Sequence, residues 1–224
     1  MEAAVKPGSE AELAQLVAQA EAPFEMIGTG TKRGLGRPVQ AARTLDMSAF
    51  AEIAAYEPEE LILEAGAGTR LAEIEALIAA RGQQLAFEPP DLSRLLGSPH
   101  SGTLGGLMAC NLAGPRRIKA GAARDHVLGI RGVSSRGEVF KAGARVVKNV
   151  TGYDLPKLLT GSYGTLAALT SITVKVLPRP ETEETILVEG LDDTAAVSVM
   201  SLAMQSECEV SGADYVSGEG TFLR

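Results

Sequence analysis

The sequence is poor in the residues that most often hold metal ions and disulfides. It has no tryptophan, two histidines (His100 and His126) and two cysteines (Cys110 and Cys208). Neither histidine has an aspartate, glutamate or cysteine at the spacing of a metal-ligand pair, so the pattern argues against a mononuclear zinc site. The two cysteines lie far apart in the chain. This indicates no disulfide framework and fits a reducing cytosol.

The sequence also lacks an excess of positive charge and long apolar runs. The net charge is −7 and the isoelectric point is about 5.0, which argues against nucleic-acid binding because such binding needs a basic face. No apolar run is long enough to span a membrane. The first ten residues lack the basic start and apolar run of a signal peptide. We therefore expect a cytoplasmic protein whose membrane contact is peripheral or made through a partner.

Glycine, in contrast, is abundant, with 25 residues. Residues 101–114 read SGTLGGLMACNLAG and predict a turn that opens a helix, with Thr103 as N-cap and Gly105 and Gly106 in the first turn. Glycine is a poor helix former, so the presence of two adjacent glycines in the first helical turn requires an explanation. Room for a phosphate at the positive helix end is one reason, and tight packing against a neighbouring backbone is the other. This segment alone supports both equally. Two further glycine-rich loops, at 28–36 and 161–164, favour the phosphate.

The loop at residues 28–36 follows a predicted strand at Phe24–Ile27. It runs into Pro38 and not into a helix, which excludes a Rossmann fingerprint, and it lacks the lysine and hydroxyl pair of a P-loop. Its N–H donors and the adjacent Lys32 and Arg33 suit a pyrophosphate. A flexible surface loop is the alternative.

The rest of the pattern predicts alternating helices and strands. Ser9 begins a helix, a strand covers 61–65, and Thr69 caps a helix that ends at Gly82. Further strands are expected at 44–47, 127–133, 138–141, 145–147, 172–176 and 185–188. Helices are expected at 154–161 and 192–206, and a hairpin at 210–223. Proline at 178 and 180 marks the best domain boundary, and the segment after it is too small to hold a large core alone.

The sequence offers few side chains for acid–base chemistry. Many backbone groups that could bind an anion, together with few acid–base side chains, are typical of a protein whose cofactor carries out the chemistry. Tyr153 and Tyr163 are candidate polar aromatics of a cofactor pocket, or they simply pack.

Several ordered motifs resemble one family. They are GTGTK at 28–32, PP at 89–90, GTLGG at 102–106, NLAGP at 111–115, RDHVLG at 124–129, KNVTGYD at 148–154 and GSYGTL at 161–166. In this order they resemble the FAD-binding (PCMH-type) domain of vanillyl-alcohol oxidase type flavoproteins. Within that family they are most similar to the FAD-binding E subunits of glycolate oxidases.

The resemblance implies an α+β fold. Residues 1–180 would form a PCMH-type FAD-binding domain of two α/β subdomains (about 1–88 and 89–180), and 181–224 would form a partial cap domain. It implies that backbone amides at 28–32 and 102–106 hold the pyrophosphate, that 109–114 line the flavin, and that FAD is bound noncovalently because no histidine or cysteine lies in the first loop. The implied cofactor-binding residues are Gly28, Thr29, Gly30, Thr31, Lys32, Pro89, Gly102, Thr103, Leu104, Gly105, Gly106, Ala109, Asn111, Ala113, Gly114, Arg124, Asp125 and Val127.

The resemblance also implies a function. The chain would be the FAD-binding subunit of a complex that oxidises glycolate or another small 2-hydroxy acid, with a sister flavin subunit and an iron–sulfur subunit as partners. Such a complex would lie in the cytoplasm, at the inner face of the membrane if its partners take it there. Related enzymes carry glutamate at the position of Tyr163, and their catalytic side chains come largely from the cap, so no catalytic residue is assigned. A non-catalytic subunit that relays electrons or stabilises a sister subunit is the alternative.

Overall fold

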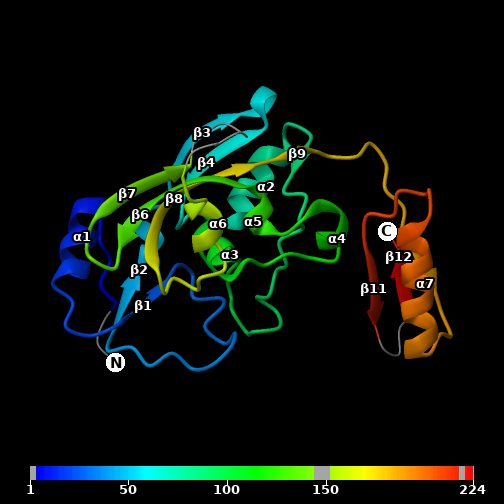
Figure 1. Ribbon diagram of the computed structural model, residues 1–224, viewed down its shortest axis with the longest axis horizontal. Coiled ribbons are helices and arrows are strands. Elements are labelled where there is room, and N and C mark those ends of the chain that lie inside the picture. Colours follow the sequence, from blue (N-terminus) through cyan, green and yellow to red (C-terminus); the bar gives the residue numbers. More distant parts are fainter. Residues whose placement is uncertain (1–3, 144–151, 217–219, 224) are drawn as a thin grey trace.

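A five-stranded antiparallel sheet forms the centre of the molecule (Figure 1). The computed structural model describes residues 4–143, 152–216 and 220–223. The strand order is β3-β4-β8-β6-β7, with bounds β3 (Ile53–Glu57), β4 (Ile62–Gly66), β6 (Val127–Ser134), β7 (Val139–Gly143) and β8 (Ala167–Lys175). Together with the helices described below, this confirms the predicted α+β class.

The central strand β8 pairs with β4 on one side and with β6 on the other. Leu63 lies opposite Val174, and Ile130 lies opposite Ile172. The predicted subdomains, about 1–88 and 89–180, therefore share one sheet, because β4 of the first pairs with β8 of the second. The edge strand β3 was not expected from the sequence, because its short segment IAAYE is only half buried and carries a register shift between Ile53 and Ala55.

Helices cover the core made by this sheet. The bounds are α2 (Leu71–Ala79), α3 (Leu104–Cys110), α4 (Arg117–Ala120), α5 (Ala123–His126) and α6 (Leu155–Leu159). Leu71, Ile74 and Ile78 of α2 are buried, and they join a cluster that includes Phe87 and Leu107. Burial of this apolar stripe is what fixes α2 on the core.

Thr69 does not cap α2 as predicted. The N-cap is Arg70, and Thr69 is fully buried with its hydroxyl oxygen unpartnered among the described residues. The end of the helix is as predicted, since Gly82 adopts the left-handed conformation with φ of 65°.

A smaller unit packs on β6 and β8 through Leu13, Leu45, Val133 and Ala168. It contains α1 (Glu10–Ala18), the parallel pair β1 (Phe24–Ile27) and β2 (Arg43–Asp46), and the 3₁₀ turn η1 (Met47–Ala49). Arg131 of β6 donates two hydrogen bonds to the Glu10 carboxylate, and Thr170 of β8 donates a third at 2.6 Å. These bonds attach α1 to the sheet.

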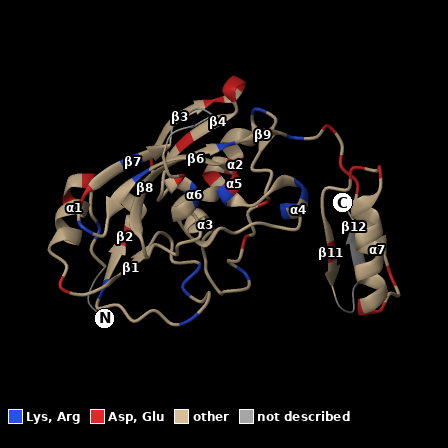
Figure 2. Ribbon diagram, viewed as in Figure 1, with Lys and Arg blue, Asp and Glu red and all other residues tan. Residues whose placement is uncertain are grey.

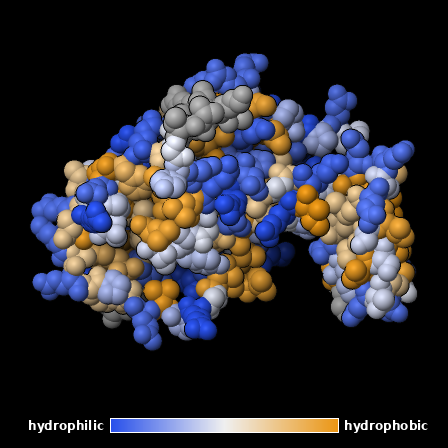
Figure 3. All heavy atoms as spheres, in the orientation of Figure 1, coloured by the Kyte–Doolittle hydropathy of each residue, from blue (hydrophilic) through white to orange (hydrophobic). Residues whose placement is uncertain are grey.

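The C-terminal segment forms a separate unit, which stands to the right in Figure 1. Its elements are β10 (Ile186–Val188), α7 (Asp193–Gln205), β11 (Ala213–Val216) and β12 (Gly220–Leu223), in strand order β10-β12-β11. The segment that connects the sheet domain to this unit begins after β9 (Leu177–Pro178), which pairs with β5 (Gln83–Gln84). This connecting segment is acidic (Figure 2). Figure 3 shows apolar residues on the surface of this unit. The predicted hairpin is confirmed by the antiparallel pair β11 and β12.

The remaining short element is the 3₁₀ turn η2 (Pro58–Glu60). The strand predicted at 145–147 and the motif residues 148–151 lie outside the described residues. Within the described ranges, no helix is long and apolar enough to cross a membrane.

Candidate functional site

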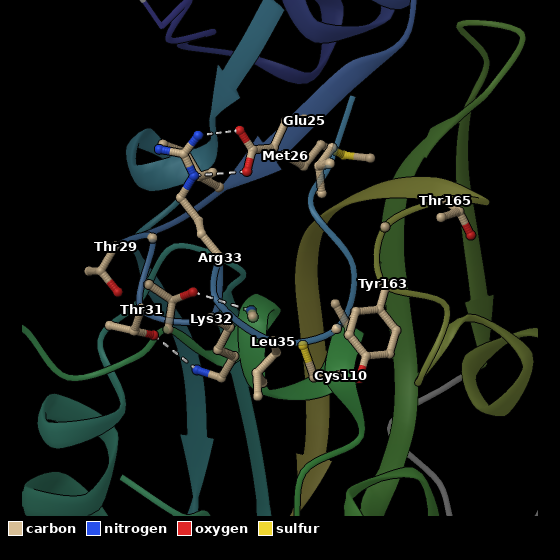
Figure 4. Close-up of a pocket in the computed structure, with 18 of the residues that line it drawn as sticks. Glu25, Met26, Thr29, Thr31, Lys32, Arg33, Leu35, Cys110, Tyr163 and Thr165 are labelled. Atoms are coloured by element: carbon tan, nitrogen blue, oxygen red, sulfur yellow. Dashed lines mark hydrogen bonds and ion pairs between the residues drawn. The ribbon is translucent and has the colours of Figure 1, made fainter. Parts of the chain in front are cut away.

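A cavity of about 420 Å³ lies between β1, the loop at 28–36, α3 with its N-cap Thr103, and the loop at 161–165 (Figure 4). We call it the first cavity, and the segment 28–36 the first loop. Its size is within the range usual for small-molecule sites. It is lined by Phe24, Glu25, Met26, Ile27, Thr29, Gly30, Thr31, Lys32, Arg33, Leu35, Gly36, Arg37, Val39, Thr103, Gly106, Ala109, Cys110, Tyr163, Gly164 and Thr165.

The first loop is fastened to the turn before α3. The Thr29 hydroxyl donates to the Ser101 carbonyl at 2.9 Å. A Cβ on Gly28 would lie 2.5 Å from Oγ1 of Thr103, so only glycine allows this approach. Two segments separated by about seventy positions in sequence thereby share one wall of the first cavity.

The first turn of α3 uses its own backbone donors. Thr103 is the N-cap as predicted, and its Oγ1 accepts from the Gly106 N–H at 3.2 Å. The Leu104 N–H donates to the Thr69 carbonyl at 2.9 Å, and the Gly105 N–H donates to the Ala67 carbonyl at 2.7 Å. Of the amides of 102–106, which the resemblance implies as pyrophosphate donors, those of 104–106 are therefore already engaged inside the protein.

Gly105 and Gly106 have different surroundings. A Cβ on Gly105 would lie 2.8 Å from both Cβ and the carbonyl oxygen of Ala67, which requires glycine for packing. A Cβ on Gly106 would meet Thr103 at 3.4 Å and Lys32 Nζ at 3.8 Å, which are ordinary contacts, and Gly106 lines the first cavity. Of the two reasons open at sequence level, packing explains Gly105 and room in the cavity explains Gly106.

Unengaged donors lie in the first loop instead. The N–H groups of Gly30, Thr31 and Lys32 make no hydrogen bond within the described part of the chain. Gly30 has a φ of 73°, a left-handed conformation that helps successive amides point to one side. Consecutive amides of this kind form an anion-binding concavity.

Lys32 brings positive charge to the same place. Among the described residues its ammonium makes one hydrogen bond, to Thr31 Oγ1 at 3.2 Å, and no ion pair. Burial lowers the pKa of Lys32, and the acidic groups of Cys110 and Asp91 partly offset that effect. The neighbouring Arg33 is already paired, because it donates two bonds to Glu25 at 2.8 and 2.7 Å. Lys32 is thus a cation of this wall whose charge an anionic ligand would stabilise, and Arg37 also lines the first cavity.

The residues expected to bind a cofactor fall into three groups. Thr29, Gly30, Thr31, Lys32, Thr103, Gly106 and Ala109 line the first cavity. Pro89 and Gly114 line a second cavity, also about 420 Å³, whose other walls are Glu88, Pro90, Pro115 and Arg116 of the sheet domain and Thr185, Gly212, Ala213 and Asp214 of the C-terminal unit. The remaining residues surround these cavities without lining either: Gly28, Gly102, Leu104, Gly105, Asn111, Ala113, Arg124, Asp125 and Val127.

Two residues of the last group, Asn111 and Arg124, hold the end of α3, and a third, Asp125, holds the start of α5. Asn111 caps this helix with φ of 50°, and its Oδ1 accepts from the Arg124 N–H at 3.0 Å. Asp125 Oδ2 accepts from the Ala122 N–H at 2.8 Å at the start of α5. Their observed contacts are structural, and contact with a cofactor stays a prediction for them.

Several lining residues carry no sequence motif. Met26, Leu35 and Cys110 reach the first cavity only because β1, the first loop and α3 converge there. Burial raises the pKa of the Cys110 thiol, which disfavours its reactive thiolate. Tyr163, in contrast, lies in the glycine-rich GSYGTL motif and is one of the two tyrosines that the sequence offers for a cofactor pocket, and it lines the first cavity. The described residues include no group of three or more side chains suited to hold a metal ion.

Comparison with known proteins identifies the family of this chain. A model of the FAD binding domain matches residues 1–143. The chain belongs to the FAD-binding domain family. Glycolate oxidase subunit GlcE of Escherichia coli is 40% identical over 203 residues, which cover 88% of this chain and 56% of that protein. Glycolate oxidase subunit GlcD of Bacillus subtilis is 30% identical over 200 residues, covering 87% of this chain and 41% of that protein. The chain spans about half the length of the curated relatives it matches.

Solved structures agree on the fold of this FAD-binding domain. An alkyldihydroxyacetonephosphate synthase superposes with a TM-score of 0.71 at 24% identity, covering 93% of this chain and 38% of that one. The observed site fits the cofactor, because a diphosphate needs the features found in the first cavity: unengaged amides at 30–32, the Lys32 ammonium and the open side of Gly106. FAD is the cofactor of this chain.

Proposed function

We propose that this chain is the FAD-binding part of an oxidoreductase subunit that acts on a small 2-hydroxy acid, with glycolate as the first candidate. The observation that carries the proposal is the first cavity, with its anion-binding wall, in a chain 40% identical to a glycolate oxidase subunit. The proposed FAD-binding domain covers residues 1–180, with subdomains about 1–88 and 89–180. Residues 181–224 would begin a cap domain.

In this proposal the chain binds and orients its cofactor. The amides of Gly30 and Thr31 and the Lys32 ammonium hold the diphosphate, and Gly106 leaves room for it. The segment 109–114, which runs from Ala109 at the first cavity to Gly114 at the second, would hold the flavin end, and Pro89 also lines the second cavity. When bound, the cofactor would supply a two-electron acceptor for the hydride from C2 of the acid, and loss of the hydroxyl proton to a base would complete oxidation to the 2-oxo acid. Since the first loop has no histidine or cysteine, binding is noncovalent.

The proposed setting is a complex. Electrons would leave through an iron–sulfur subunit, and a sister flavin subunit would be a further partner. The assembly would lie in the cytoplasm, reaching the membrane through its partners. The names of the two relatives as subunits of glycolate oxidase support this arrangement.

Two measurements test the proposal in order. First, the absorbance spectrum of the purified protein is recorded, and again on the supernatant after acid denaturation. Flavin bands that move to the supernatant are expected. Bands that stay with the pellet would overturn noncovalent binding, and Cys110, the cysteine of the first cavity, would be substituted next.

The second measurement is an anaerobic glycolate titration of the protein alone and of the assembled complex. We expect glycolate to cause loss of the oxidised flavin bands. D-lactate is tested beside it as a chemically related acid, and succinate as an unrelated acid. A flavin that no 2-hydroxy acid reduces in either preparation would contradict the oxidoreductase proposal and leave an electron-relay subunit.

A further inference from the structure

Tyr163 occupies an unfavourable backbone conformation at the mouth of the first cavity. Its φ is 54°, in the left-handed region that non-glycine residues seldom adopt. Its flanking residues Gly161 and Gly164 also have positive φ, of 89° and 74°. A bulky aromatic residue retained in such a loop needs a compensating reason.

The loop is held in this shape by α3. The Gly161 N–H donates to the Met108 carbonyl at 2.9 Å, and the Tyr163 N–H donates to the Ala109 carbonyl at 2.8 Å. These bonds tie the backbone of Tyr163 to the last turn of a buried helix. Its ring is therefore carried by a rigid support even though the residue is 59% exposed.

The Tyr163 ring is available to a ligand. Within the described part of the chain, the Tyr163 side chain makes no hydrogen bond and no ring contact. It lines the first cavity and also a small adjoining cavity of about 70 Å³. In Figure 4 the ring lies across the site from Lys32, with Leu35 and Cys110 drawn between them. An exposed aromatic face that borders a cavity is a surface on which a planar ring can stack.

The part of the first cavity near Tyr163 is apolar. Met26 and Leu35 line it, and the Met26 methyl group lies 3.2 Å from the position a Cβ on Gly164 would take. The anion-binding wall around Lys32 occupies another part. A ligand with a charged diphosphate and a planar aromatic end matches this division of the cavity.

We propose that Tyr163 is the stacking platform for the adenine ring of FAD. This inference rests on the proposed placement of the cofactor in the first cavity. The adenine end is favoured over the flavin end because Gly114, the last residue of the segment 109–114 expected to line the flavin, lines the second cavity, which borders the C-terminal unit. With the diphosphate at Lys32, the flavin extends toward that cavity and the adenine remains beside Tyr163.

Binding measurements on the full chain test this assignment. Dissociation constants are measured for FAD, ADP and FMN with the wild type, Y163F and Y163A. Because stacking needs the ring and not the hydroxyl, Y163F should bind as the wild type does. Y163A should lose about tenfold in affinity for both FAD and ADP, with FMN unchanged. Wild-type affinity of Y163A for ADP would overturn the inference, and so would a loss confined to FMN.

The variant Y163G separates binding from folding. Glycine relieves the positive φ, so thermal stability should stay equal or rise, while ADP affinity falls as in Y163A. If Y163G binds ADP as the wild type does, the ring has no stacking role. If the wild type itself binds no FAD, the proposed placement of the cofactor in the first cavity is wrong, and the inference about Tyr163 falls with it.

Discussion

The first loop and the first turn of α3 are both rich in glycine, and both face the same cavity, yet they use glycine differently. In the first loop, Gly30 allows a left-handed turn that leaves the amides of 30–32 without partners among the described residues. In α3, Gly105 allows close contact with Ala67, and the amides of 104–106 are all engaged. A glycine-rich helix start is thus not sufficient evidence for an anion site. Unpartnered donors are the better evidence.

The largest effect should come from the packed side of α3. G105A would place a methyl group 2.8 Å from the Ala67 carbonyl oxygen, and the neighbouring backbone would have to move. Overpacking of this kind costs about 2–3 kcal/mol of unfolding free energy. Urea denaturation measures it, and G106A is the matched control. Equal stability of the two variants would remove the contrast between the two glycines.

The next effect should come from the charge beside the first loop. K32Q removes the ammonium and should weaken FAD binding about tenfold to a hundredfold, as expected for a charge-assisted hydrogen bond. K119Q, on the exposed surface of α4, is the charge-matched control. Wild-type affinity in K32Q would show that the first loop does not hold the diphosphate.

The same residue gives a pH dependence. Burial lowers the pKa of Lys32 in the free protein, and a bound diphosphate raises it again by favouring the charged form. Affinity for ADP should therefore be full at low pH and fall as the pH rises through the lowered pKa, before an ordinary lysine, at about 10.4, would lose its proton. K32Q should show no such fall over this range, as measured by calorimetry at several pH values.

A smaller effect is expected on the cavity side of α3. G106A adds a methyl group where the diphosphate would lie and should weaken FAD binding about fivefold, equivalent to about 1 kcal/mol. Stability should not fall, because alanine favours a helix over glycine by about 1 kcal/mol and no clash forms. Unchanged affinity for FAD would place the ligand elsewhere.

The smallest effect should arise away from both glycine segments. E10Q weakens the bonds from Arg131 and Thr170 and should lower the unfolding free energy by about 1 kcal/mol at neutral pH, since the pair is partly exposed. FAD affinity should not change. E21Q, an exposed residue after α1, is the control.

The Glu10 effect should disappear in acid. Hydrogen bonding by Arg131, opposed by partial burial and assisted by Thr170, lowers the pKa of Glu10. The folded state therefore favours the carboxylate, and its contribution is present above the pKa of an unfolded glutamate, about 4.3, and is lost as the pH falls through the lower folded value. The stability gap between wild type and E10Q should narrow below about pH 4.3. A gap that widened there would contradict this account.

Local signals in the sequence predicted local features. The Thr103 cap, the Gly82 helix end and the strand Phe24–Ile27 depend on neighbouring residues, and all are confirmed. Thr69 has the residue type of a cap but is fully buried below the turn that precedes α3, and its carbonyl accepts from Leu104. Tertiary packing thus overrode a correct local preference.

The site was predictable where motifs carry it. The first loop and the start of α3 were found from their glycines, and both line the first cavity. The apolar wall formed by Met26 and Leu35 has no pattern of its own, because it exists only when β1 and the first loop fold against α3. Which amides remain free is likewise decided by partners such as Ala67 and Thr69, and no sequence pattern reveals those pairings.

The walls of the first cavity come from segments far apart in the order of synthesis. Residues 24–39 are made early, 103–110 later, and 163–165 only after most of the sheet domain. The strand β8 that follows pairs Lys175 with Ile62, so the sheet cannot close before that point either. A growing chain therefore completes its FAD site only when translation has passed these residues. We expect ribosome-bound chains that end before residue 160 to retain no FAD, whereas released full chains do.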